Sequence, residues 1–131
     1  MALTTYGEKI ANTLDGVIEL FSDEFRWTQH GHFRLHPDDA EHCFSSDLNN
    51  NSDDQVESMK SLAGPTVCFC LEGAVYRCAA NGLAATTTMR YLDKLTEGEG
   101  TVAWNDAPKR TVVEVREFVA RARAAISPAN S

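Results

Sequence analysis

Four histidines and a cysteine gather within fourteen positions: His30, His32, His36 and His42, followed directly by Cys43. Imidazole nitrogen and thiolate sulfur are suitable ligands for zinc. A His-x-His pair in an extended strand directs both rings to one side, so His30 and His32, closed by His42 and Cys43, could hold a metal. The spacing matches no zinc finger, zinc ribbon or His-Glu-x-x-His pattern. The alternative is a set of solvated loop histidines, and we assign no cofactor.

A second group of chemically capable residues surrounds a tryptophan. Asn105 and Asp106 could orient a ligand or act as a general base, and Trp27 and Trp104 could together form the floor of a shallow pocket. The structural alternative is that Asn and Asp bind their own backbone in a turn, after which Ala107-Pro108 prepares the chain for a helix. In that case we also expect Asp106 to pair with Arg110.

The remaining nucleophiles do not form a known catalytic motif. The four cysteines contain no Cys-x-x-Cys pair. Cys70 lies in an apolar segment, where burial would raise its pKa and limit access to it, which argues against a nucleophilic role. A Gly-x4-Gly-Lys-Ser/Thr phosphate loop and a Gly-x-Ser-x-Gly elbow are both missing from the sequence. These observations favour a protein without catalytic activity.

The net charge of −7 is placed unevenly along the chain. Residues 1–57 carry twelve acidic against three basic side chains, a balance of −9, whereas residues 58–131 have a balance of +2. Affinity for nucleic acid comes mainly from Lys and Arg on phosphates, so direct nucleic-acid binding is disfavoured. A basic protein surface is the expected partner, and the candidate partner-binding residues are Asp38, Asp39, Glu41, Asp47, Asp53, Asp54 and Glu57. The first three form no EF-hand loop.

Residues 45–54 are almost entirely polar. Such a run buries too little apolar surface to offset the entropy of ordering it. We therefore predict a mobile loop there, within an acidic insertion that spans residues 37–61 of one helical domain, residues 1–131.

Hydrophobic spacing predicts about four helices that would position these groups. The last begins at Thr111, which with Glu114 forms a capping box. The first begins after a similar Thr5–Glu8 pair. Their inward faces are periodic at three and four residues: Ile10, Leu14, Val17, Ile18 and Phe21 in the first helix, and Val112, Val115, Val119, Ala122 and Ile126 in the last.

Between these amphipathic helices lies a segment that is apolar nearly all round. We predict a central buried helix from Pro65, a residue favoured at the first helical position, to a stop at Asn81-Gly82. Gly73 would let a neighbouring backbone approach closely. Residues 67–71 alone would also fit a short buried strand. A third helix is expected over residues 84–95, with Met89, Leu92 and Leu95 facing inward.

The length of 131 residues and 43% hydrophobic content fit a single globular domain. The sequence has no apolar stretch long enough to span a bilayer and no secretion signal at its start. We therefore expect a cytoplasmic protein with reduced thiols and no membrane partner. Oligomeric state cannot be read from the pattern.

Three segments resemble one protein family: Trp27-Thr28-Gln29, Phe69-Cys70-Leu71-Glu72-Gly73-Ala74, and Trp104-Asn105-Asp106-Ala107-Pro108-Lys109-Arg110-Thr111 with Glu114 and Val115. The chain is similar over most of residues 5–126 to a family of small, mostly helical bacterial and phage proteins of unknown function. The Trp-Asn-Asp-x-Pro loop is the most specific part of the resemblance. The acidic stretch from about residue 37 to 61 looks longer than the corresponding linker. The resemblance implies a mainly α-helical fold and no particular chemistry.

Two functional hypotheses follow from these patterns. The first is a non-catalytic acidic protein that binds a basic surface on a protein partner, for example a phage-encoded inhibitor of a host defence complex. The second is a metal- or small-ligand-binding protein, including a hydrolase, that uses the cluster from His30 to Cys43.

Overall fold

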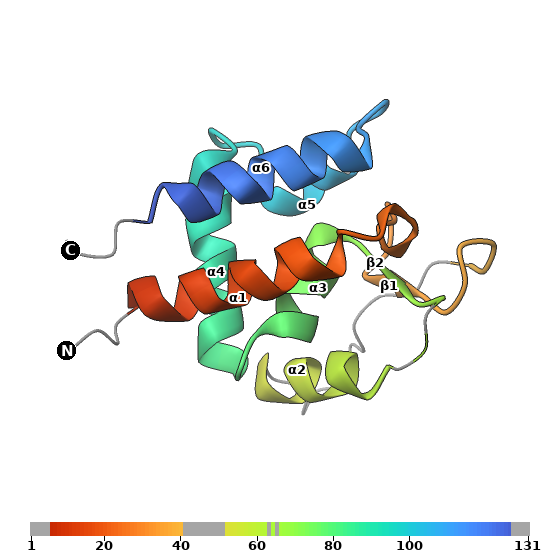
Figure 1. Ribbon diagram of the computed structural model, residues 1–131, viewed down its shortest axis with the longest axis horizontal. Coiled ribbons are helices and arrows are strands. Elements are labelled where there is room, and N and C mark those ends of the chain that lie inside the picture. Colours follow the sequence, from red (N-terminus) through yellow and green to blue (C-terminus); the bar gives the residue numbers. More distant parts are fainter. Residues whose placement is uncertain (1–5, 41–51, 63, 65, 127–131) are drawn as a thin grey trace.

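The structure is a computed structural model that describes residues 6–40, 52–62, 64 and 66–126 (Figure 1). The fold is mainly helical, as predicted. Its elements in chain order are α1 (Tyr6–Leu20), the 3-10 helix η1 (Glu24–Arg26), β1 (Phe33–Arg34), α2 (Ser52–Ser61), β2 (Cys68–Phe69), α3 (Leu71–Cys78), α4 (Gly82–Leu95), α5 (Thr101–Asn105) and α6 (Val112–Ala124). None of the described helices is both long and apolar enough to cross a bilayer.

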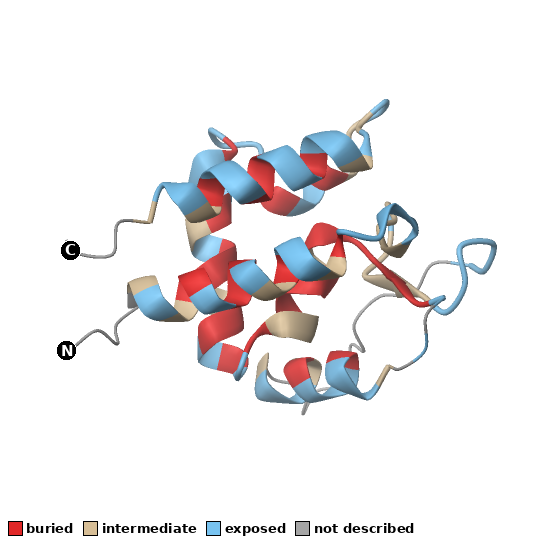
Figure 2. Ribbon diagram, in the orientation of Figure 1, coloured by how far each residue is buried: buried red, intermediate tan, exposed pale blue. Residues whose placement is uncertain are grey.

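Helices α1, α4 and α6 form the main packing layer. In Figure 1, α6 runs antiparallel beside α1, and α4 crosses both. The buried faces of these helices meet in one core (Figure 2). Leu14 and Val17 of α1 are fully buried, as is Phe21 directly after the helix, and Ile10 is nearly so, as the spacing predicted. Ile18 was also expected inside, but 38% of its surface is exposed because it lies at the edge of the contact with α6.

The start of α6 is the predicted capping box. The Thr111 hydroxyl accepts a hydrogen bond from the Glu114 amide at 3.2 Å, and the Glu114 carboxylate accepts one from the Thr111 amide at 3.0 Å. Both bonds satisfy backbone donors that a helix start leaves without partners. Val115, Val119 and Ala122 face the core. The corresponding Thr5 pair in α1 lies outside the described residues.

The single helix predicted from Pro65 is wrong at its start. Residues Cys68–Phe69 form β2, which pairs antiparallel with β1 in the register Phe33 to Phe69 and Arg34 to Cys68. The helix begins only at Leu71, because the Cys70 amide donates to the His32 carbonyl and so belongs to the strand side of the junction. The short buried strand, the alternative interpretation of residues 67–71, is therefore correct for Cys68–Phe69.

Helix α3 is nevertheless a central buried element, with Ala74 and Val75 fully inaccessible to solvent. Gly73 lies against the backbone of His32: a Cβ added to it would overlap the His32 carbonyl oxygen and lie 3.0 Å from the carbonyl carbon. The close backbone approach expected at Gly73 is confirmed, and it holds the β1 segment against α3.

Two helix boundaries and one inward position differ from the sequence prediction. Residues 52–54, expected in a loop, form the first turn of α2, which packs Val56 and Met59 onto the core; residues 45–51 lie outside the described residues. Helix α4 starts two residues early because Asn81 caps it, and Leu95, expected inside, is 40% exposed.

The predicted Trp104-Asn105 loop is also partly helical. Its first residues belong to α5, a short helix of Thr101–Asn105.

Candidate functional site

The side chain of Asn105 is the centre of a hydrogen-bond network between distant parts of the chain. Its Oδ1 accepts hydrogen bonds from Trp27 Nε1 at 2.7 Å and from the Leu71 amide at 3.2 Å. Its Nδ2 donates to the Thr28 carbonyl at 3.2 Å and to Asp106 Oδ1 at 3.0 Å. The residue is 1% exposed. Both Asn105 amide atoms are thus engaged in joining η1, α3 and α5.

Asp106 and Gln29 extend the same network toward the surface. Asp106 Oδ1 accepts a hydrogen bond from the His30 amide at 2.8 Å, and Gln29 Nε2 donates to the carbonyls of Asn105 and Ala107. The Asp106 side chain is 25% exposed. A general base needs a lone pair directed at its substrate. Asp106 Oδ1 does not meet this need, because it already accepts from the His30 amide and from Asn105 Nδ2.

The two tryptophans play different parts. Trp27 is half-buried and directs its indole N–H into the network. Trp104 lies between Phe118, whose ring centroid is 4.4 Å away, and the Arg110 guanidinium, 4.0 Å above the Trp104 ring. Arg110 also donates to the Trp104 carbonyl and pairs with Glu114, so the predicted Asp106–Arg110 pair is not formed. Three residues of the predicted ligand pocket, Trp27, Asn105 and Asp106, are thus joined by hydrogen bonds, and the Trp104 ring is packed against Phe118 and Arg110.

Each of the three described histidines of the cluster lies beside a different carboxylate, and His36 Nδ1 is 3.8 Å from Asp38 Oδ2. His32 Nε2 lies 3.1 Å from Glu72 Oε1, and His30 Nδ1 lies 3.9 Å from Asp106 Oδ2. Among the residues that the structure describes, no group of three or more His, Cys, Asp or Glu side chains could hold a metal ion. His42 and Cys43, the other two candidate ligands, lie outside the described residues.

The described cysteines are poor nucleophiles. Burial raises the pKa of Cys70 to about 12 and that of Cys78 to about 11, and burial also raises the pKa of Cys68. Cys70 Sγ accepts a hydrogen bond from the Gly73 amide at 3.3 Å, so this thiol caps α3. The role expected for Cys70, a protonated and inaccessible thiol, agrees with this geometry.

The candidate partner-binding acids lie on two described segments. Asp38 and Asp39 are exposed in the loop after β1, and the side chain of Asp38 is 92% accessible. Glu57 is exposed on α2, one residue from the buried Val56. The loop is joined to the chain that follows α2, because the Thr66 hydroxyl donates to the Leu35 carbonyl at 2.8 Å. We call Asp38, Asp39, Asp53, Asp54 and Glu57 the acidic surface; Glu41 and Asp47 lie outside the described residues.

Asp53 differs from the other acids because it also has a structural task. Its Oδ1 accepts a hydrogen bond from the Gly82 amide at 2.7 Å, and this bond joins α2 to the start of α4. Asp53 and Asp54 both lie in the first turn of α2, where negative charge is stabilised by the helix dipole. The sequence shows the charge of Asp53 but gives no sign of its bond to Gly82, since the two residues are 29 positions apart.

The model of DUF6197, described as a family of unknown function, matches residues 5–125. The chain belongs to DUF6197. No functionally curated protein and no solved structure matches the sequence. All the described helices lie within the DUF6197 match, and the predicted resemblance to a family of unknown function is confirmed. The Asn105 network lies within the matched residues.

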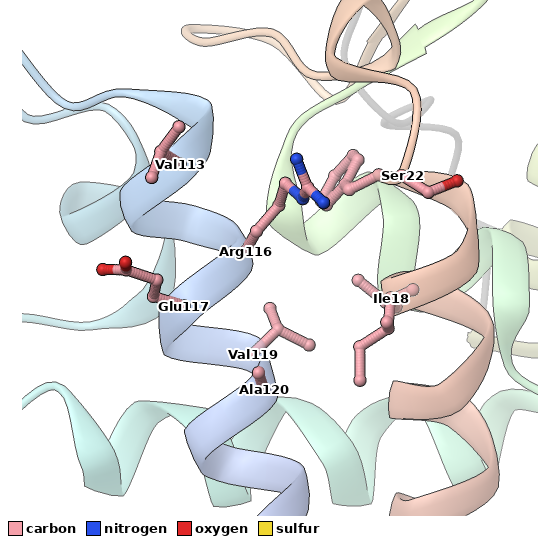
Figure 3. A pocket seen from close by; sticks show the side chains of 9 residues that line it. Ile18, Ser22, Val113, Arg116, Glu117, Val119 and Ala120 are labelled. Carbon is pink, nitrogen blue, oxygen red and sulfur yellow. The ribbon is translucent and has the colours of Figure 1, made fainter.

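This DUF6197 chain also has an apolar groove that the sequence analysis did not anticipate. The groove lies between α1 and α6 and encloses about 410 Å³. Ile18 and Val119 face one another across it, and Arg116 and Glu117 come from the α6 side (Figure 3). Arg116 spans to η1, where it pairs with Glu24 at 3.3 Å. The sequence gives no sign of the groove, because the hydrophobic spacing of α1 places Ile18 among the inward residues, whereas its side chain lies at the groove.

Proposed function

We propose that the protein is a non-catalytic interaction protein whose acidic surface binds a basic surface on a protein partner. The observation that supports this most directly is the exposure of Asp38, Asp39 and Glu57. Carboxylates placed outside the core contribute little to stability, whereas a patch of one sign attracts partners of the opposite sign and accelerates their association.

The way α2 is held supports a recognition role for its outer face. Val56 and Met59 fix one side of the helix in the core, and Asp53 fixes its start through Gly82. Glu57 is thereby presented on a helix whose position is set by packing. A rigid acidic helix loses little conformational freedom on binding, which favours affinity.

The partner's chemistry follows from the charges. Between residues 38 and 57 the sequence carries seven acids and no base, so the complementary surface is rich in Lys and Arg. Such surfaces occur where proteins bind nucleic acid. One specific form of the proposal is a phage-encoded inhibitor that occupies the nucleic-acid groove of a host defence complex.

Charge reversal tests the proposal. The variant Asp38→Lys, Asp39→Lys, Glu57→Lys changes three exposed acids of the acidic surface. The matched control, Glu97→Lys, Glu99→Lys, Glu117→Lys, makes the same change in net charge at exposed acids elsewhere. Each purified protein is immobilised and used to capture partners from cells of the source organism, with the identified partner then purified for titration against salt.

We expect one or more basic proteins to bind the unaltered chain and the control variant but not the acidic-surface variant. The affinity should fall with rising salt, because exposed charges are screened over about 8–10 Å at ordinary ionic strength. A partner that binds all three proteins equally, or binding that is insensitive to salt, would contradict the proposal.

The alternative of a metal- or small-ligand-binding protein depends on His42 and Cys43, which the structure does not describe, and it stays a prediction. Zinc content of the purified protein tests it, since a site built by these residues would bind zinc stoichiometrically and lose it when His32 and Cys43 are replaced by alanine.

A further inference from the structure

A polar cavity between α1, η1, α2 and α3 gathers three cations of an acidic protein. The cavity has a volume of about 480 Å³, within the usual range for small-molecule sites. Arg26 comes from η1, Lys60 from the last turn of α2 and Arg77 from the last turn of α3. These residues are far apart in the sequence, so only the fold brings them together.

Two of the three cations donate to backbone carbonyls. Lys60 Nζ donates to the Arg77 carbonyl at 3.0 Å, and Arg26 Nε donates to the Val67 carbonyl at 2.6 Å. Within the described part of the chain, none of the three forms an ion pair with a carboxylate. Gathering three cations that form no ion pair is unfavourable, and each side chain keeps donors that could bind an anion.

Arg77 is the least well satisfied of the three side chains. Its Nε is buried, and it has no hydrogen-bond partner among the described residues. A buried donor without an acceptor costs about 1–3 kcal/mol, so such atoms are rare unless a ligand, ion or water supplies the acceptor. Arg77 lines the cavity, and its Nε, which solvent does not reach, becomes accessible to an anion only when neighbouring side chains shift.

The other ionisable groups of the cavity leave a net positive charge. Glu19 and Asp23 also line it, which makes two negative against three positive side chains. The Cys78 thiol is the third possible anion, but burial raises its pKa to about 11 and keeps it neutral at pH 7. A long polyanion would be repelled by the two carboxylates, whereas a compact anion would bind the cations alone.

We propose that Arg26, Lys60 and Arg77 form a binding site for a phosphate group, either free phosphate or a small phosphate monoester. Arginine donors match the geometry of phosphate oxygens, and lysine supplies a point charge. Glu19 and Asp23 are acceptors available to the hydroxyl groups of a monoester. The site is separate from the acidic surface and goes beyond the proposed interaction function.

Titration with inorganic phosphate and with glycerol 3-phosphate tests the site. Binding is measured by isothermal calorimetry and by amide chemical shifts, with sodium chloride of equal ionic strength as the reference. Lys60→Met removes one cation from an exposed side chain and should leave the fold intact. Lys94→Met, in the last turn of α4 and outside the cavity, is the matched control. Arg77→Lys keeps the charge but removes the buried Nε.

We expect saturable binding with shifts at the amides of Arg77 and Cys78. Affinity should be weakened roughly tenfold by Lys60→Met and by Arg77→Lys, because each loses a charge-assisted hydrogen bond, and unchanged by Lys94→Met. Tighter binding of the ester than of free phosphate would assign the site to a monoester, and the reverse would assign it to the free ion. The absence of saturation at tens of millimolar, or equal binding by Lys60→Met and Lys94→Met, would overturn the proposal.

Discussion

Replacing Asn105 by leucine removes the hydrogen bonds of the central junction while keeping a side chain of similar size. The change takes the acceptor from Trp27 Nε1 and from the Leu71 amide, and the donor from the Thr28 carbonyl. Leu71 is completely buried, so water cannot replace its lost partner, whereas Trp27 and Thr28 are half-buried and can recover part of their loss.

The magnitude follows from these exposures. Leaving a buried polar group without a partner costs about 1–3 kcal/mol. With the full cost at Leu71 and a reduced cost at the other two groups, we expect a loss of about 3–5 kcal/mol in the free energy of unfolding. Since domains of this kind are stable by about 5–15 kcal/mol, the melting temperature should fall by about 10–20 °C.

Urea unfolding followed by circular dichroism measures this loss, with Asn12→Leu on the exposed face of α1 as the control. The control should stay within about 0.5 kcal/mol of the unaltered chain. If Asn105→Leu unfolds at the same urea concentration as Asn12→Leu, the network does not stabilise the junction and the reasoning is refuted.

A second variant separates loss of donors from loss of acceptors. Asn105→Asp keeps the oxygen that accepts from Trp27 and Leu71. It replaces the Asn105 Nδ2 group, which donates to Asp106 Oδ1 at 3.0 Å, by a second carboxyl oxygen. Repulsion and burial raise the pKa of the introduced carboxyl above its unfolded value of about 3.9. Above about pH 3.9 the native state of the variant then binds more protons than its unfolded state, so its free energy of unfolding falls as the pH rises. Asn105→Asp should therefore be less destabilised at about pH 4 than at pH 7.

Two further predictions concern α3. Gly73→Ala places a Cβ on the His32 carbonyl oxygen, whose position is fixed by the Cys70 amide, so we expect a loss of about 2–3 kcal/mol in urea unfolding; a loss below about 0.5 kcal/mol would show that β1 can move away. The pKa of Cys70 is about 12 in the folded protein against an ordinary value of 9.0. The native state therefore keeps a proton that the unfolded state releases, and stability should fall as the pH rises from 9.0 through about 12. Cys70→Ser, which keeps the cap on α3, should show a shallower fall in the urea midpoint over that range, and an unchanged pH dependence would contradict the assignment.

The parts of the fold that the sequence predicts are those decided by neighbouring residues. The Thr111–Glu114 capping box and the spacing of Val115, Val119 and Ala122 set α6 within a few positions of the chain. Helix α1 follows from the same kind of pattern. Such local signals are sufficient because helical hydrogen bonds join residues four apart.

Structure that depends on distant residues could not be predicted in this way. Residues 68–69 are strand because Phe33 and Arg34 lie beside them, and an apolar run by itself fits strand or helix. Trp27 and Asn105 are 78 positions apart, so the motif is visible in the sequence but its bonds are not. Helix α2 had one usable signal, the spacing of Val56 and Met59, within a polar run that reads as a loop.

The cationic cavity had no signal in the sequence. Arg26, Lys60 and Arg77 are single charges in three separate elements. The charge balance of the two halves does not indicate a cationic site either, because Arg26 lies in the strongly acidic residues 1–57.

The late position of Asn105 in the chain affects how the protein is made. During synthesis on the ribosome, Trp27 and Leu71 emerge long before the residue that binds them both, and α6 follows later still. A nascent chain that stops before α5 would therefore expose the hydrophobic faces that α1 and α4 turn toward α6, and such faces promote aggregation. Productive folding of this core must wait until α5 and α6 have been made, so we expect a chain cut short before α5 to be recognised by chaperones and proteases.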